Sequence, residues 1–150
     1  MATELEQIAS GLREAGRHEE ADIIETSVMM AGDPGLNASV ESLVMQSGRP
    51  AATALLVATE ESAEHLAQLA DPVLAERADD VRSLGRRAAA RASGVKPGVV
   101  RGILIAGSLG PADVAEIATN AKGVALAGGG VTAHAAIGRA SCRERVLTDV

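Results

Sequence analysis

Apolar residues recur at intervals of three and four positions through most of residues 3–93, the spacing that gathers side chains on one face of a helix. The pattern predicts five helices, separated by glycines and by two Asp-Pro steps. In each step the aspartate can cap a helix whose first residue is the proline. The expected helices span 3–15, 17–31, 34–47, 50–69 and 72–92. We therefore expect residues 1–93 to form an antiparallel helical bundle.

The pattern changes after Gly94, where the apolar runs become shorter and richer in β-branched residues, as is typical of strands. Two such runs, 99–106 and 123–127, flank a short helical segment that begins at Pro111. A helix between two strands predicts an α/β layer. We therefore expect a second unit over residues 94–137.

Three glycines, Gly128–Gly130, follow the second predicted strand and let the backbone turn sharply. Thr132 is a candidate N-cap, which places His134 in the first turn of the next helix. Unpaired amides and the positive end of the helix dipole suit a phosphate at such a place. A neutral imidazole, with an unperturbed pKa of ~6.5, can accept a phosphoryl group on a ring nitrogen. On the local pattern alone, the alternative is a solvated histidine without a chemical role.

Composition narrows the classes of function. The chain of 150 residues has a net charge of −6 and no aromatic residues, so it lacks the basic stripe and the stacking platforms of nucleic-acid binders. No apolar run approaches the ~20 residues of a membrane span, and the N-terminus has no signal-peptide layout. We therefore expect no nucleic acid or membrane partner and a cytoplasmic location. Cys142 is the only cysteine, which predicts neither a disulfide framework nor a metal site.

Three stretches resemble a known family. Residues 129–137, Gly-Gly-Val-Thr-Ala-His-Ala-Ala-Ile, resemble the phosphohistidine signature of phosphoenolpyruvate-utilising enzymes, Gly-Gly-x-Thr-Ser/Ala/Cys-His-x-Ala-Ile. Residues 71–87 resemble a helix of enzyme I of the sugar phosphotransferase system, which the related dikinases and synthases lack in this position. Residues 29–36 resemble the Met-Leu-x-Asp-Pro-x-Leu segment of enzyme I. The sequence is thus similar to an N-terminal fragment of enzyme I.

The resemblance implies a fold and a reaction. It makes 1–93 a helical subdomain of the HPr-binding type and 94–137 an incomplete α/β phosphohistidine domain of the swivelling type. In the complete enzyme a phosphoryl group passes from phosphoenolpyruvate to the histidine, and then to the histidine of the carrier protein HPr. The resemblance implies that His134 is the catalytic nucleophile.

The resemblance also implies roles for the residues around that histidine and for the rest of a longer protein. Gly129, Gly130 and Thr132 orient the ring or bind phosphate. No stretch of the 150 residues resembles the phosphoenolpyruvate-binding part with its magnesium ligands. We therefore expect the chain to be unable to use phosphoenolpyruvate alone, with no cofactor of its own. Magnesium and a homodimer formed through the C-terminal part are implied for the full-length enzyme.

Two other interpretations stay open. The chain also fits the enzyme-I-like part of a phosphotransferase-dependent dihydroxyacetone kinase subunit, which carries the same histidine layout. The other is a catalytically silent helical module for protein interaction, in which His134 is unused.

The second predicted helix carries a candidate docking surface. Ile23 and Met30 fall nearly opposite its expected inner face, Met29 lies between the two faces, and Leu36 follows the Asp-Pro corner. Methionines make adaptable contacts, and exposed apolar patches mark interaction sites. By resemblance HPr docks in this region. The alternative is that both faces of the helix are buried.

The last segment, residues 138–150, departs from the family pattern directly after Ile137. Its sequence resembles the translation of a sequencing-adapter read-through. We therefore expect a non-native tail here; the alternative is an ordinary basic, solvated helix.

Overall fold

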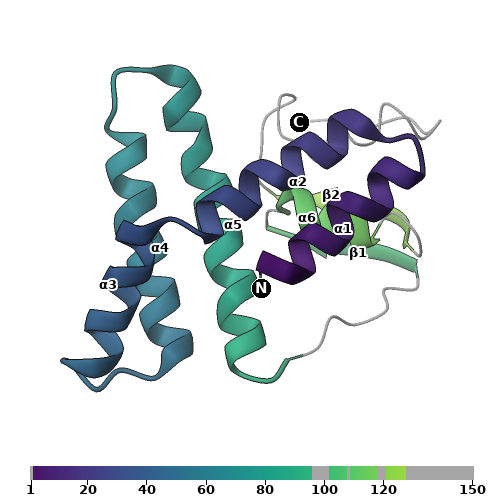
Figure 1. The fold of residues 1–150 in the computed structure, drawn as a ribbon. Coiled ribbons are helices and arrows are strands. Elements are labelled where there is room, and N and C mark those ends of the chain that lie inside the picture. The colour runs from purple at the N-terminus through teal and green to yellow at the C-terminus, as the bar shows by residue number, and fades with distance from the viewer. Residues whose placement is uncertain (1, 96–101, 108, 118–120, 128–150) are drawn as a thin grey trace. The chain divides into compact units, whose positions relative to one another are not determined.

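The computed structural model describes residues 2–95, 102–107, 109–117 and 121–127. The chain forms two compact units, residues 1–98 and residues 99–150. In the first unit the described residues form five helices, each within two residues of its expected bounds (Figure 1). They are α1 (Ala2–Glu14), α2 (His18–Ala31), α3 (Pro34–Met45), α4 (Ala51–Ala67) and α5 (Pro72–Ala92).

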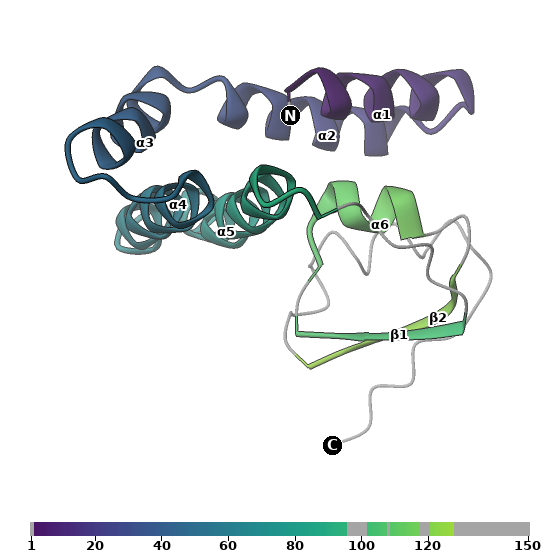
Figure 2. The ribbon, with the colours of Figure 1, turned by 90° about the horizontal axis from the view of Figure 1, so that it is seen from below.

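The helices of the first unit pack as two antiparallel pairs. α1 and α2 lie side by side, joined by a short turn, and α4 and α5 form the second pair (Figure 2). α2 also contacts α5, and α3 packs on α4. The apolar faces between α1 and α2 are buried, with Leu5 and Ile24 almost completely inaccessible to solvent. The predicted helical bundle is therefore confirmed.

The two Asp-Pro steps begin helices as predicted. Oδ1 of Asp33 accepts a hydrogen bond from the backbone N of Leu36 at 2.7 Å. Oδ1 of Asp71 accepts one from the backbone N of Val73 at 2.9 Å. Each aspartate thereby satisfies an amide that has no partner within its helix, which fixes the start of α3 and of α5.

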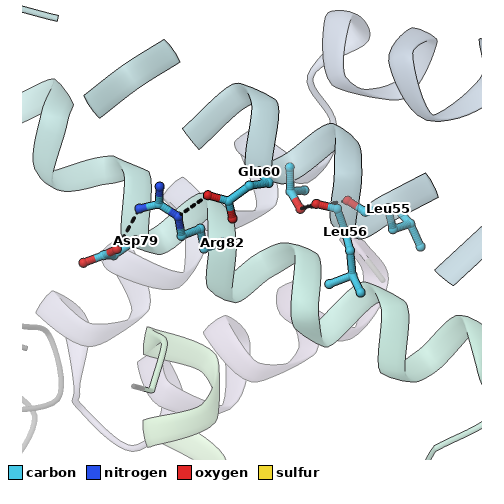
Figure 3. A network of polar contacts seen from close by, with 6 residues as sticks. Leu55, Leu56, Glu60, Asp79 and Arg82 are labelled. Atoms are coloured by element: carbon cyan, nitrogen blue, oxygen red, sulfur yellow. Dashed lines mark hydrogen bonds and ion pairs between the residues drawn. The ribbon is translucent and has the colours of Figure 1, made fainter. Parts of the chain in front are cut away.

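α4 and α5 approach each other closely at a glycine. A β-carbon on Gly85 would lie 2.7 Å from the β-carbon of Thr59 and still closer to its Oγ1 atom. Thr59 is itself buried, and its hydroxyl donates to the carbonyl oxygen of Leu55 at 2.7 Å. Leu55 and Leu56, whose carbonyls Thr59 contacts, are drawn in Figure 3. Only glycine leaves room for this contact, so Gly85 has a packing role in the middle of a helix.

A cluster of charged side chains connects α1 with α5. The carboxylate of Glu4 accepts hydrogen bonds from Nη2 of Arg87 at 2.7 Å and from Nε of Arg91 at 3.1 Å. The Arg87 side chain is only 8% exposed. The hydrogen bond from Arg91, opposed by burial and reinforced by Arg87, holds the pKa of Glu4 below its ordinary value. The cluster therefore stabilises α1 against α5.

A second charged group lies on the surface between α4 and α5. Arg82 lies between Glu60 and Asp79, with Nε 2.9 Å from Oε1 of Glu60 and Nη1 3.1 Å from Oδ1 of Asp79 (Figure 3). Both carboxylates are exposed, so these pairs contribute little to stability.

The described part of the second unit contains β1 (Gly102–Ala106), α6 (Pro111–Ile117) and β2 (Ala121–Leu126). The strands are parallel, with Ile103 paired to Gly123 and Ala106 to Leu126. Gly102, whose φ is 114°, stands at the irregularity where the register shifts. The predicted strand–helix–strand order is therefore confirmed, although β2 begins two residues earlier than expected. Residues 99–101 of the first predicted strand lie outside the described residues.

Candidate functional site

The predicted phosphohistidine loop follows β2. Its residues Gly129, Gly130, Thr132 and His134 lie outside the described residues, so their assignments stay predictions. The segment 138–150 also lies outside them. The described structure fixes where the chain enters the loop.

β1 and β2 end at the same edge of their sheet. Ala106 pairs with Leu126, and the backbone N of Ala127 donates to the carbonyl oxygen of Ala106 at 3.0 Å. Because the strands are parallel, both carboxyl ends lie at this edge, where open α/β sheets bind ligands. The chain therefore leaves β2 toward the predicted glycine loop at the edge of the sheet that is suited to a phosphate site.

A side chain in the first turn of α6 holds the start of that helix. The backbone N of Gly110 donates to Oδ2 of Asp113 at 3.1 Å, which fixes the start of the helix before Pro111. Among the described residues, no three His, Cys, Asp or Glu side chains are grouped to hold a metal ion. None of the helices in the described ranges has the length and apolar character that crossing a bilayer requires.

The four predicted docking residues have different surroundings. Met29 is 70% exposed at the C-terminal end of α2. Ile23 and Leu36 are half-buried. Met30 is also half-buried and packs against a buried cluster formed by Ala63, Ala78 and Val81. Of the four residues, Met29 therefore has the most accessible side chain.

Met30 has a core contact, as the alternative of a helix buried on both faces requires at this position. Its partners belong to α4 and α5, which pack against the end of α2, whereas Ala21 and Ile24 are the buried residues on its predicted inner face. α2 is therefore apolar on two sides, because α1 covers one side and the α4–α5 pair lies against the other. The periodicity of a single helix contains no information about a second packing partner, so this contact could not be found from the sequence pattern.

An exposed apolar group at the turn between α4 and α5 was missed. Val73 and Leu74 at the start of α5 are exposed, as is Leu69 before the turn. These residues lie at the ends of the helices, beyond the buried part of the α4–α5 contact that begins at Ala63 and Ala78. We name Leu69, Val73 and Leu74 the hairpin patch.

Two acidic side chains of α2 form ion pairs with α1. Oε2 of Glu25 lies 2.8 Å from Nη2 of Arg13, and Oδ1 of Asp22 lies 2.9 Å from the same nitrogen. These contacts connect α1 and α2 at the surface. Glu19 is exposed at the start of α2.

Comparisons with known proteins agree with this architecture. Residues 1–77 match the family described as PEP-utilising enzyme, N-terminal, and residues 99–141 match PEP-utilising enzyme, mobile domain. The second match begins where the second compact unit begins.

Two relatives extend the comparison. A multiphosphoryl transfer protein of Xanthomonas campestris pv. campestris is 39% identical over 102 residues, which cover 63% of this chain and 12% of that protein. The solved structure described as the N-terminal domain of Enzyme 1 - Nitrogen has a TM-score of 0.70 and 28% identity, covering 92% of this chain and 58% of that one. The chain thus spans only part of each relative's length. In sequence and in fold, the chain belongs to the family of PEP-utilising enzymes and corresponds to N-terminal sequence of an enzyme I-type phosphotransferase protein.

Proposed function

We propose that this chain carries a phosphoryl group on His134 and exchanges it with the histidine of an HPr-type phosphocarrier protein. The observation that supports this most directly is the entry of the signature loop at the carboxyl edge of a parallel strand pair, within the match to the mobile domain. The Xanthomonas relative is named a multiphosphoryl transfer protein, which supports phosphoryl transfer as the reaction.

The transfer is a displacement at phosphorus. The P–N bond to the histidine of the carrier breaks as a P–N bond to a ring nitrogen of His134 forms. The attacking imidazole must be neutral, and the phosphoryl oxygens carry negative charge throughout. Gly129, Gly130 and Thr132 have the proposed role of holding those oxygens or the ring, because backbone amides at a helix start attract anions.

The proposed docking surface consists of Ile23, Met29, Met30 and Leu36. Met29 supplies an exposed and adaptable apolar side chain, and Met30 supports it from the core cluster. The hairpin patch adds further exposed apolar side chains on the α4–α5 pair. Exposed apolar groups of this kind mark interaction sites, which supports a protein partner for the helical unit.

The rest of the proposal concerns the longer protein. We expect a cytoplasmic protein of the phosphotransferase system, dimeric at full length, with magnesium required for the step that uses phosphoenolpyruvate. Both an enzyme I and a multidomain phosphotransferase protein fit as the longer protein that contains this sequence.

A labelling experiment tests the central step. Incubation with HPr phosphorylated on its histidine should give an acid-labile, alkali-stable phosphate on His134, located by mass spectrometry. His134→Ala should abolish the label and keep the helical circular dichroism, whereas His18→Ala and His65→Ala serve as matched controls and should keep the label. Equal labelling of the wild type and His134→Ala would falsify the assignment. Absence of any label in wild type that binds HPr would favour the silent interaction module.

A further inference from the structure

Two adjacent methionines in α2 have thioethers in different surroundings. Met29 is 70% exposed, whereas Met30 packs against Ala63, Ala78 and Val81. Successive helical residues point to different sides, so one side chain can face solvent while its neighbour joins the core. Met45, the last residue of α3, is 77% exposed and provides a second accessible thioether.

Accessibility decides which thioether reacts with a peroxide. The sulfur lone pair attacks one peroxide oxygen, the O–O bond breaks, and an S–O bond forms. The sulfur loses two electrons, the peroxide is reduced, and the products are a sulfoxide and water. Because the oxidant must reach the sulfur, oxidation follows exposure. Met29 and Met45 therefore react before Met30.

We propose that Met29 is a reversible oxidation site for peroxides, and that its sulfoxide blocks docking of the phosphocarrier. The docking half of this inference rests on the proposed function. Oxidation converts a flexible apolar side chain into a polar, chiral one. At Met29 this places a sulfoxide on the proposed docking surface, where a partner that covers it leaves a polar oxygen unsatisfied. At Met45, outside the docking surface, the same change has no such consequence.

The experiment uses the complete chain with Cys142→Ser in every sample, so that thiol oxidation does not contribute. Hydrogen peroxide is added, and peptide mapping by mass spectrometry follows the sulfoxide at each methionine. HPr binding is measured before and after oxidation in the wild-type background, in Met29→Leu and in Met45→Leu. Methionine sulfoxide reductases are then added to reverse the modification.

We expect Met29 and Met45 to oxidise several-fold faster than Met30. Oxidation should weaken HPr binding several-fold in the wild-type background and in Met45→Leu, and the reductases should restore it. For Met29→Leu, the ratio of affinities before and after oxidation should stay near unity, whatever its starting affinity.

Two results overturn the inference: equal oxidation rates at Met29 and Met30, or oxidation of Met29 that leaves HPr binding unchanged. Absence of HPr binding in the unoxidised chain overturns the proposed function and the docking half together. The oxidation rates of Met29 and Met30 are measured without HPr. They therefore test the oxidation site even if the unoxidised chain does not bind HPr.

Discussion

Thr59 occupies the space that a side chain on Gly85 would need. A β-carbon on Gly85 would lie 2.7 Å from the Thr59 β-carbon and 2.9 Å from its Cγ2 atom, with Oγ1 closer than either. These distances are far shorter than a van der Waals contact. α4 and α5 therefore depend on this one glycine for their close approach.

Gly85→Ala should destabilise the helical unit. Alanine gains up to about 1 kcal/mol of helix propensity over glycine, but here its methyl group collides with buried Thr59. We expect a net loss of about 1–3 kcal/mol in the free energy of unfolding, measured by urea denaturation followed by circular dichroism. Gly11→Ala is the matched control, since apart from its chain neighbours and the adjacent backbone of its own helix no atom lies within 4 Å of the position that its added β-carbon would take. That variant should be neutral or more stable, and equal effects at the two glycines would contradict the packing role.

Glu4 should make the stability of the helical unit depend on pH. The pKa of Glu4 in the folded chain lies below its ordinary value of 4.5, first because of the hydrogen bond from Arg91. A lowered folded pKa stabilises the fold fully above the unfolded value, and this contribution is lost as the pH falls through the folded value. Glu4→Gln should lower the free energy of unfolding at neutral pH by about 1.5–3 kcal/mol.

The same measurement at acidic pH completes that test. Below the folded pKa of Glu4 the wild type and Glu4→Gln should converge, because the carboxyl is then neutral in both states. Glu25→Gln is the control, as the Glu25–Arg13 pair is half exposed at the surface and should contribute at most about 1 kcal/mol. A difference between wild type and Glu4→Gln that is constant with pH would exclude the ionic explanation.

Met29→Glu should weaken HPr binding, whereas Met30→Glu should lower the stability of the helical unit. At exposed Met29 a carboxylate leaves the melting temperature unchanged but weakens HPr binding, because it introduces charge into the docking surface. At Met30 it enters the cluster of Ala63, Ala78 and Val81, with an expected loss of about 1–3 kcal/mol in stability. Met45→Glu controls for a new charge on an exposed methionine. Unchanged HPr binding in Met29→Glu would place the docking surface elsewhere.

Amide hydrogen exchange should distinguish the two units in this 150-residue chain. In β1, Ile103 is 73% exposed and Ile105 is 80% exposed, whereas α5 buries Ala78, Val81 and Leu84. Few buried apolar contacts mean low local stability. The amides of β1 should therefore exchange faster than those around the buried residues of α5, as read by mass spectrometry. Equal protection in both segments would contradict this expectation.

The starts of α3 and α5 could be predicted from local sequence alone. Asp33 and Asp71 accept amide hydrogen bonds where the Asp-Pro steps predict them, because a cap depends only on residues a few positions away. Contacts between elements were less predictable. In the sequence, Gly85 is simply a glycine that weakens a helix, and its packing role follows only from its contact with Thr59. Met30 likewise has no core partner that can be predicted before the positions of α4 and α5 are known.

Only part of the candidate site could likewise be predicted from local sequence. The strand and helix order around it follows from apolar runs and is confirmed. The roles of His134, Gly129, Gly130 and Thr132 come from a motif, and they stay predictions because those residues lie outside the described part of the chain. The hairpin patch was missed because periodicity predicts a helix's inner face but does not say where along the helix its neighbour ends.

The hydrogen bond that Arg87 donates to Glu4 has a consequence for the order of events during synthesis. The two residues are separated by 83 positions in the chain. At an elongation rate of about 5–20 residues per second, Arg87 emerges several seconds after Glu4. During those seconds Glu4 has neither Arg87 nor Arg91 as a partner, because α5 is the last helix of the unit to be synthesised. The contact between α1 and α5 can therefore form only after all five helices of the unit have been synthesised.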